Sequence, residues 1–324
     1  MKTFVRLSAG AALLLGAIAA GPAAMAAYPE RPVRMVVGFA PGGAADVIAR
    51  VVAEGLSREL GQQVVVENRP GAESTIAANT VARAEPDGYV FGLGTNSAMV
   101  AVPTRPDSVV SYDPFKDFTP ISTAGQFSMF LVVNPKLPVK TVNDLLDYAA
   151  ARPGELNSAS SNSAAELAMV QLLAKRGAKV VNLRYKGDVP ALTDLVAGEV
   201  DMIFTTGTSA PNLVKDGRVR ALFTLQPERS PLLPEVPTAA EEGIDQITIL
   251  PWAGFFGPAG MPADVTQTLS GALQKVLSDE KVRAELVGQG FEAYGMSPEE
   301  FAVYFKQRYD GWVDTIRDNN ITFD

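Results

Sequence analysis

The fold is decided by one stretch of sequence, Val33-Arg34-Met35-Val36-Val37-Gly38-Phe39-Ala40-Pro41-Gly42-Gly43-Ala44-Ala45-Asp46. Its first half is an apolar run of strand length, which Pro41-Gly42-Gly43 ends. Apolar residues then recur at helical spacing from Val47 to Leu60, and Gly61 stands where a C′ glycine is expected. The stretch predicts a buried strand, a glycine turn and a helix whose first N–H groups are open to an anion. An ordinary strand–helix turn without a ligand is the alternative interpretation.

The first 26 residues have the pattern of a secretory signal peptide. Lys2 and Arg6 precede an apolar segment from Ala9 to Ala20, which is too short to span a bilayer, and Ala24-Met25-Ala26 matches a cleavage site. We therefore expect residues 1–26 to be removed and the protein to reach the periplasm. A membrane anchor and a buried N-terminal helix are the alternatives.

The composition excludes several classes of function. The chain contains no histidine and no cysteine, so it cannot build a Ser-His-Asp or Cys-His catalytic centre or the usual zinc and copper sites. Removal of the leader leaves 298 residues with 26 basic and 36 acidic side chains, a net charge of −10. Such an acidic chain is not expected to bind nucleic acid. We predict no metal and no cofactor.

Further strand–helix units follow the opening one. Val64–Glu67 and Tyr89–Gly94 are predicted strands, and the second leads into a polar loop, Thr95-Asn96-Ser97. Strands that alternate with helices indicate a mainly parallel sheet, in which ligands bind beyond the carboxyl ends of the strands. The turn from Phe39 to Asp46 and the loop at Thr95 are both expected at that edge.

A second unit of the same kind lies further along the chain. A strand over Glu155–Ala159 leads into Ser160-Ser161-Asn162-Ser163 and a helix over Ala164–Arg176. The alternative is a plain helix cap, because Ser163 and Glu166 have the spacing of a capping box. A later strand ends at Phe204 and is followed by Thr205-Thr206. The uncharged segment Ile247–Phe256 can return the chain to the first unit.

Several motifs together resemble one known family. They are Val37–Asp46, Val66–Ala72, Pro86–Tyr89, Leu93–Thr95, Tyr112–Phe118, Tyr185–Gly187, Ala191–Leu195 and Leu233–Thr238. In this order, over nearly all of the chain beyond the leader, they are similar to the periplasmic receptors of tripartite tricarboxylate transporters, the Bug family.

The resemblance implies an α/β fold, that of a two-domain periplasmic binding protein of the venus-flytrap, type II-like class with two crossing segments. We place domain 1 at residues 27–127 and 252–324 and domain 2 at residues 128–251. The implied function is to bind a small carboxylate in the interdomain cleft and deliver it to the membrane components of a tripartite tricarboxylate-type transporter. The implied receptor is a monomer and not an enzyme.

The resemblance also implies which residues meet the ligand. They are Phe39, Ala40, Gly42, Gly43, Ala44, Ala45 and Asp46 in the first turn, Thr95 and Asn96, Ser160, Ser161, Asn162 and Ser163 in the second turn, and Thr205 and Thr206. Asp46 either meets an amino group of the ligand or is a helix-start acid that interacts with the dipole.

This chain departs from the family pattern near the expected cleft. Many relatives have Gly-Gly-Asn at Glu73–Thr75, Ser-Gly-Asn-Gly-Thr at Ser161–Ala165 and Asp-Asn at Thr205-Thr206. The resemblance therefore does not identify the carboxylate. An exported α/β hydrolase that uses Lys186 and the turn Ser160–Ser163 is the alternative function.

Overall fold

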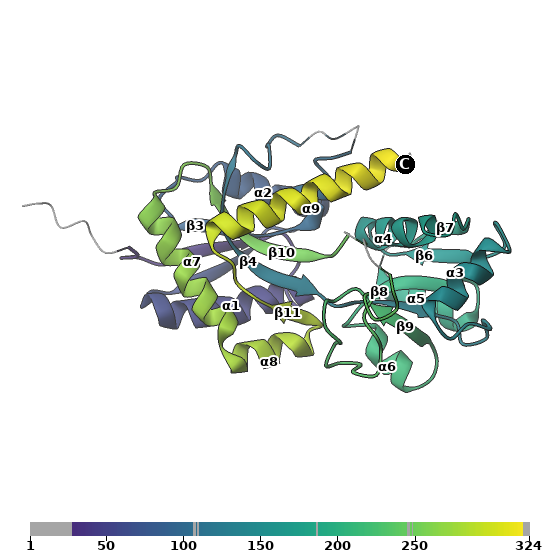
Figure 1. Cartoon of the computed structure of the whole chain (residues 1–324). Coiled ribbons are helices and arrows are strands. Elements are labelled where there is room, and N and C mark those ends of the chain that lie inside the picture. Colours follow the sequence, from purple (N-terminus) through teal and green to yellow (C-terminus); the bar gives the residue numbers. More distant parts are fainter. Residues whose placement is uncertain are drawn as a thin grey trace, which may run out of the picture.

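The computed structural model describes residues 28–105, 108, 110–185, 187–244, 247 and 249–319. The expected leader and Lys186 lie outside these residues. The molecule is an elongated two-domain α/β protein in which two β-sheets lie one beyond the other along its length (Figure 1).

The first sheet has six strands in the order β11-β4-β10-β3-β1-β2. They are β1 (Val33–Val37), β2 (Val64–Asn68), β3 (Val90–Thr95), β4 (Phe118–Phe127), β10 (Trp252–Pro258) and β11 (Phe291–Ala293). β1 pairs in parallel with β2 and β3, whereas β10 is antiparallel to β3 and β4. The carboxyl ends of β1, β2 and β3 therefore share one edge, where ligands of such sheets bind.

The second sheet has five strands in the order β7-β6-β8-β5-β9. They are β5 (Met129–Val133), β6 (Asn157–Ser160), β7 (Val181–Arg184), β8 (Met202–Thr206) and β9 (Arg220–Thr224). β6 is parallel to β7 and β8, and β5 is antiparallel to β8 and β9. β5 thus has the place in this sheet that β10 has in the first, and each is the strand that follows a crossing between the domains.

Apart from Arg34, which is exposed and pairs with Glu67, the residues of β1 are buried on both faces of the sheet, which explains why they are apolar. Val33, Met35 and Val37 lie in one apolar cluster with Ile48, while Val36 belongs to a second cluster on the opposite face. Ile48 lies in α1, which begins at Ala44, three residues before the predicted apolar period, and ends at Leu60 as the sequence predicts, with Gly61 in the left-handed conformation at φ 66°.

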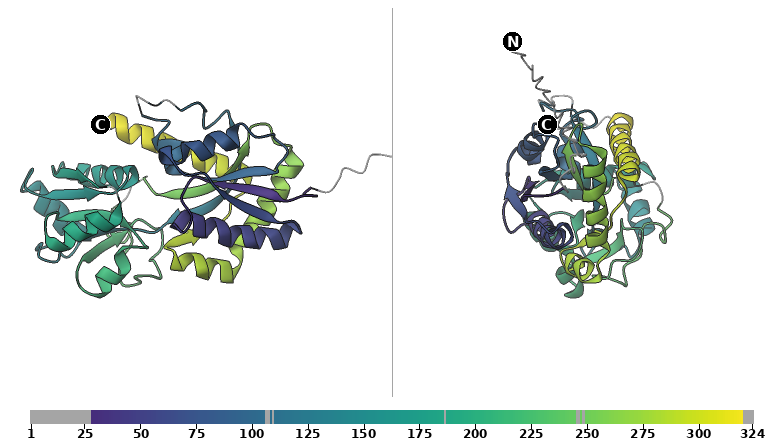
Figure 2. Two further views of the ribbon diagram at one scale, coloured as in Figure 1. Left: turned by 180° about the vertical axis from the view of Figure 1, so that it is seen from behind. Right: turned by 90° about the vertical axis from the view of Figure 1, so that its left-hand side faces the viewer.

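Helices cover both faces of the first sheet (Figure 2). The helices of this part are α1 (Ala44–Leu60), η1 (Ala72–Ser74), α2 (Thr75–Ala82), the π-helix η2 (Ser97–Ala101), α7 (Ala263–Ser278), α8 (Glu280–Gly288) and α9 (Pro298–Asp318). Those of the second part are α3 (Val142–Ala150), α4 (Ser163–Ala174), α5 (Asp188–Ala197) and α6 (Ala210–Lys215). None of the helices within the described ranges is both long and apolar enough to cross a bilayer.

The two sheets are joined where β4 continues into β5. Phe127 N–H donates to Pro251 O at 2.9 Å, so the outgoing and returning segments are hydrogen-bonded to each other. Ser128 N–H donates to Gly290 O at 2.7 Å, just before β11. The long helix α9 extends from the first sheet toward α4 (Figure 1), where Gln171 donates to the hydroxyl of Thr315 at 2.6 Å.

The predicted loop at Thr95-Asn96-Ser97 is wrong in its extent. Thr95 is the last residue of β3, and Ser97 begins η2. The chain turns into a helix here because Ala98 and Met99, which follow at once, are buried in the apolar cluster around α2.

Candidate functional site

The turn after β1 is held by one carboxylate and one amide. Gly42 has φ 85°, a left-handed value that glycine adopts at little cost, and its N–H donates to Oδ2 of Asp46 at 2.8 Å. Asn68, at the end of β2, donates to Oδ1 of Asp46 at 2.8 Å and to the carbonyl oxygen of Phe39 at 3.0 Å. Asp46 and Asn68 therefore fix both ends of the turn.

The helix after this turn begins without a side-chain cap. Gly43 is its N-cap in extended conformation, and the Gly43 N–H donates weakly to Ala40 O at 3.4 Å. Ala40 and Gly43 are exposed, Ala44 is half-buried and Ala45 is buried. The N–H groups of Ala44 and Ala45 form no hydrogen bond with another described residue. These groups can donate to an anion that approaches the exposed glycine turn.

The charge of Asp46 is neutralised inside the protein. Arg50 Nε donates to Oδ2 at 2.9 Å, and its Nη2 donates to Asn68 Oδ1 at 3.0 Å. The hydrogen bond from Arg50, followed by those from Gly42 and Asn68, lowers the pKa of Asp46 from 3.8 to about 2 despite its burial. Both oxygens thus accept from internal partners, which favours a structural role for Asp46 over contact with a ligand amino group.

A strained segment packs behind the same turn. Ala72, Glu73 and Ser74 have φ values of 45°, 51° and 73°, left-handed conformations that cost residues with a Cβ about 1–2 kcal/mol each. Ser74 Oγ donates to Gly38 O at 3.0 Å, and Glu73 accepts two hydrogen bonds from Arg105. These contacts hold the segment against the end of β1.

Thr95 presents an unsatisfied hydroxyl at the end of β3. Its side chain is buried, and Oγ1 has no hydrogen-bond partner among the described residues. Asn96, also buried, follows it and leads into the π-helix, a rare conformation that is frequent at functional sites. Buried hydroxyls without a partner are uncommon in folded proteins, and at this edge a bound solute can supply the missing partner.

In the second domain, Asn162 caps α4. Its Oδ1 accepts from Ala165 N–H at 2.9 Å, so the capping box of Ser163 with Glu166 is wrong. Ser163 is already the first helical residue, and Glu166 instead forms two hydrogen bonds with Arg184. Ser160 is buried, and its Oγ accepts from Asn182 at 3.1 Å.

The remaining residues that were expected to meet the ligand form hydrogen bonds with the carboxylate of Asp188. Asp188, the first residue of α5, accepts from Ser161 Oγ at Oδ1. Its Oδ2 accepts from Thr205 Oγ1 at 2.8 Å, from Thr206 N–H at 3.0 Å and from Thr206 Oγ1 at 2.7 Å. Three of the residues expected to meet the ligand therefore donate to Asp188.

The two groups of residues lie on facing edges. The helix α4 follows the turn after β6, η2 follows β3, and these two helices contact each other. Ala98 and Met99 of η2 share an apolar cluster with Ala164 and Ala165 of α4. No hydrogen bond between described residues links Phe39–Asp46 directly to Ser160–Ser163.

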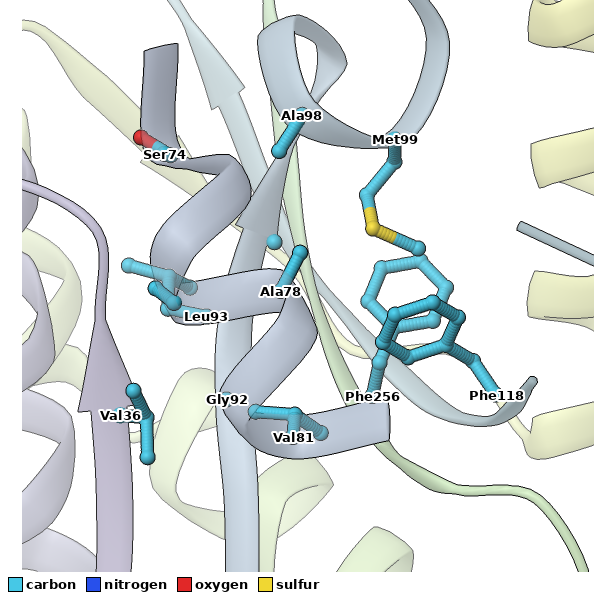
Figure 3. Close-up of a pocket in the computed structure, with 12 residues that line it drawn as sticks. Val36, Ser74, Ala78, Val81, Gly92, Leu93, Ala98, Met99, Phe118 and Phe256 are labelled. Atoms are coloured by element: carbon cyan, nitrogen blue, oxygen red, sulfur yellow. The ribbon is translucent and has the colours of Figure 1, made fainter. Parts of the chain in front are cut away.

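A cavity nearby is not the carboxylate site. Figure 3 shows it between α2, β3 and η2, with Phe118 and Phe256 beside Met99 and with Ser74 at its margin. Its volume of about 20 Å³ holds little more than one water molecule, and its walls are mostly apolar. The described residues contain no group of three acidic side chains that could hold a metal ion.

Sequence reasoning missed Asn68 and Asp188. Asn68 ends the strand next to β1, and Asp188 follows the strand next to β6. Polar residues at the ends of neighbouring parallel strands are the signal that could have identified both, once the strand order was known.

Comparisons with known proteins agree on one family. A family model described as "Tripartite tricarboxylate transporter family receptor" matches residues 48–321. Among curated proteins, BugT of Bordetella pertussis is 32% identical over 303 residues and covers 92% of each chain.

Several solved structures have the same fold. The periplasmic binding protein BugD is 31% identical with a TM-score of 0.71, covering 91% of this chain and 99% of BugD. Rpa4515 of R. palustris, solved with adipate, is 31% identical with a TM-score of 0.75 and coverages of 91% and 99%. MatC of Rhodopseudomonas palustris, solved with bound malate, is 29% identical with a TM-score of 0.70 and coverages of 89% and 100%.

Proposed function

Because the chain belongs to the tripartite tricarboxylate transporter receptor family, we propose that it is a periplasmic solute receptor which binds a small carboxylate between its two domains. It delivers this solute to the membrane components of a tripartite tricarboxylate-type transporter. Two relatives hold small carboxylates, adipate and malate, which supports the ligand class.

The main support from this chain is the set of donors at the first edge. The N–H groups of Ala44 and Ala45 and the hydroxyl of Thr95 have no partner among the described residues. A hydrogen bond to a charged group contributes about 1.5–3 kcal/mol. Three such bonds contribute about 4.5–9 kcal/mol before the cost of ordering, so micromolar affinity, about −8 kcal/mol, requires further contacts from the second domain.

The proposed binding residues keep the set expected from the sequence, with different roles. They are Phe39, Ala40, Gly42, Gly43, Ala44, Ala45, Asp46, Thr95, Asn96, Ser160, Ser161, Asn162, Ser163, Thr205 and Thr206. Within this set, Asp46 acts by shaping the turn rather than by touching the solute. We further propose domain boundaries at residues 27–127 with 252–324, and at residues 128–251.

The cellular part of the proposal concerns export and partners. We propose that residues 1–26 direct secretion and are cleaved, so that the receptor works in the periplasm as a monomer. Its role is reversible binding without turnover. Mass spectrometry of protein recovered from the periplasm should give a chain that begins at Ala27.

The decisive test substitutes Gly43. The position is open, with only Ala40 O within 4 Å of an added Cβ, and Asp is a preferred N-cap residue, so Gly43→Asp should fold at least as well as wild type. The added charge should repel the carboxylate and weaken binding by at least 100-fold. Gly43→Asn tests side-chain size without charge, and Gly271→Asp adds the same charge on an exposed part of α7.

Calorimetry supplies the measurement. Native mass spectrometry identifies any retained solute, and a panel of mono-, di- and tricarboxylates and amino acids covers the rest. Small-angle scattering of the same samples should show a smaller radius of gyration with bound solute, since one anion that touches both domains favours the closed form. If no carboxylate binds, or if Gly43→Asp binds like wild type, the proposal is wrong.

A further inference from the structure

Asp188 lies at the edge where the second domain meets its solute. β6, β7 and β8 are parallel, so the segments after them share one edge of the sheet. Asp188 is the first residue of the helix after β7, and it contacts Ser161 just after β6 and the last two residues of β8, Thr205 and Thr206. Its side chain therefore bridges all three carboxyl ends.

This carboxylate uses the donors that a ligand carboxylate would need. A carboxylate has about four acceptor positions. Oδ2 of Asp188 accepts from the hydroxyls of Thr205 and Thr206 and from the N–H of Thr206, whereas Oδ1 accepts from Ser161 and keeps a position open for a further donor. A second carboxylate brought to the same place would find these donors occupied and a like charge beside it.

The charge of Asp188 is not balanced by a described cation. Its partners are three hydroxyls and one amide, all neutral, and no described lysine or arginine forms an ion pair with it. The neighbouring acids differ: Glu166 pairs with Arg184, and Asp194 accepts from the hydroxyl of Tyr185 at 2.7 Å. Asp188 is also only half-buried, so a solute can reach it.

We propose that Asp188 sets the solute specificity of the receptor, selecting a zwitterion such as an amino acid and rejecting dicarboxylates. The carboxylate of the solute binds at the Ala44, Ala45 and Thr95 donors, and its ammonium group faces Asp188 across the cleft. An ammonium group has three N–H donors and a positive charge, and it would supply the cation that the described neighbours of Asp188 do not. The inference rests on the proposed function of carboxylate binding.

The test compares solutes of equal length. The probes are 4-aminobutanoate with succinate, 6-aminohexanoate with adipate, and the neutral α-amino acids alanine, serine and leucine, measured by calorimetry. The wild-type protein should bind at least one zwitterion ten-fold or more tightly than either dicarboxylate. Asp188→Ser removes the charge and frees the donors, so it should weaken zwitterion binding and strengthen dicarboxylate binding, each by at least ten-fold.

Two further variants separate charge from folding. Asp188→Asn keeps the shape and an acceptor oxygen but removes the charge, and it should also lose the preference for zwitterions. Asp194→Asn makes the same chemical change on the same helix, at a carboxylate that accepts a hydrogen bond from Tyr185. This control variant should keep the wild-type preference for zwitterions. If wild type binds dicarboxylates as tightly as zwitterions, or if both Asp188 variants keep the wild-type preference for zwitterions, the inference is wrong. If no carboxylate binds to wild type or to any variant, the proposed function itself is contradicted.

Discussion

Each facing edge of the two domains contains one aspartate that accepts hydrogen bonds from its own turn, and the two differ in charge balance. Asp46 is fully buried and paired with Arg50, whereas Asp188 is half-buried among neutral donors. A carboxylate whose charge is cancelled becomes part of the scaffold. A carboxylate without a paired cation attracts cationic groups and repels anionic groups that approach it.

The largest expected difference is in stability. Asp46→Ala removes the acceptor for Gly42, Arg50 and Asn68 and should lower the free energy of unfolding by about 3 kcal/mol, because groups in a buried site lose charged hydrogen bonds. Asp188→Ala should cost about 1–2 kcal/mol, chiefly because the buried Thr205 hydroxyl loses its acceptor. Urea unfolding followed by circular dichroism measures both. Equal losses would mean that the two carboxylates are equivalent parts of the scaffold.

Acid should separate the contribution of Asp46 from the rest of the protein. Its pKa of about 2 lies below the ordinary 3.8, so ionised Asp46 stabilises the fold above about pH 4, and this stability is lost as the pH falls toward 2. Since Arg50 is half-exposed and screened by solvent, we expect a loss of about 1–2 kcal/mol. Unfolding of wild type and Asp46→Asn at pH 5 and pH 2.5 should show their difference in stability shrinking with acid. A constant difference would contradict the role of the charge.

The smallest expected change in stability comes from backbone strain, which is present beside the turn of the first domain and not beside that of the second among the described residues. The residues other than glycine with positive φ in the described part are Ala72, Glu73 and Ser74. Ala72→Gly should raise stability by about 0.5 kcal/mol, since relief of the left-handed conformation slightly exceeds the added entropy of the unfolded chain. Ala302→Gly, at an exposed position inside the right-handed helix α9, should lower it by about 0.5–1 kcal/mol. Thermal unfolding gives both values, and changes of the same sign would rule out strain at Ala72.

The strand β1 and helix α1 could be predicted because their pattern is local. Val33–Val37 is apolar except for Arg34, and the period from Val47 to Leu60 is helical, so neither pattern depends on distant residues. The motifs shared with the family then identified the two-domain architecture. The comparisons with known proteins confirmed both the family and the fold class.

The hydrogen-bond partners within the site could not be predicted in the same way. Asn68 meets Asp46 across 22 residues, and Asp188 meets Ser161 across 27, so both contacts depend on which strands become neighbours. At the start of α4, Asn162 and Ser163 are both suitable caps by type. In the structure Asn162 is the cap, and Glu166 is hydrogen-bonded to Arg184 instead of completing a capping box with Ser163.

The long helix α9 has a spectroscopic consequence. The chain contains two tryptophans, Trp252 on the returning strand β10 and Trp312 on α9, and both are buried. Trp252 packs against Phe256, Phe301 and Phe305, while α9 also contacts α4 of the other domain. All indole emission of this protein therefore arises from β10 and from α9, the helix that contacts the other domain. Its wavelength and intensity can test the proposed domain closure in real time, in stopped-flow mixing, without any attached dye.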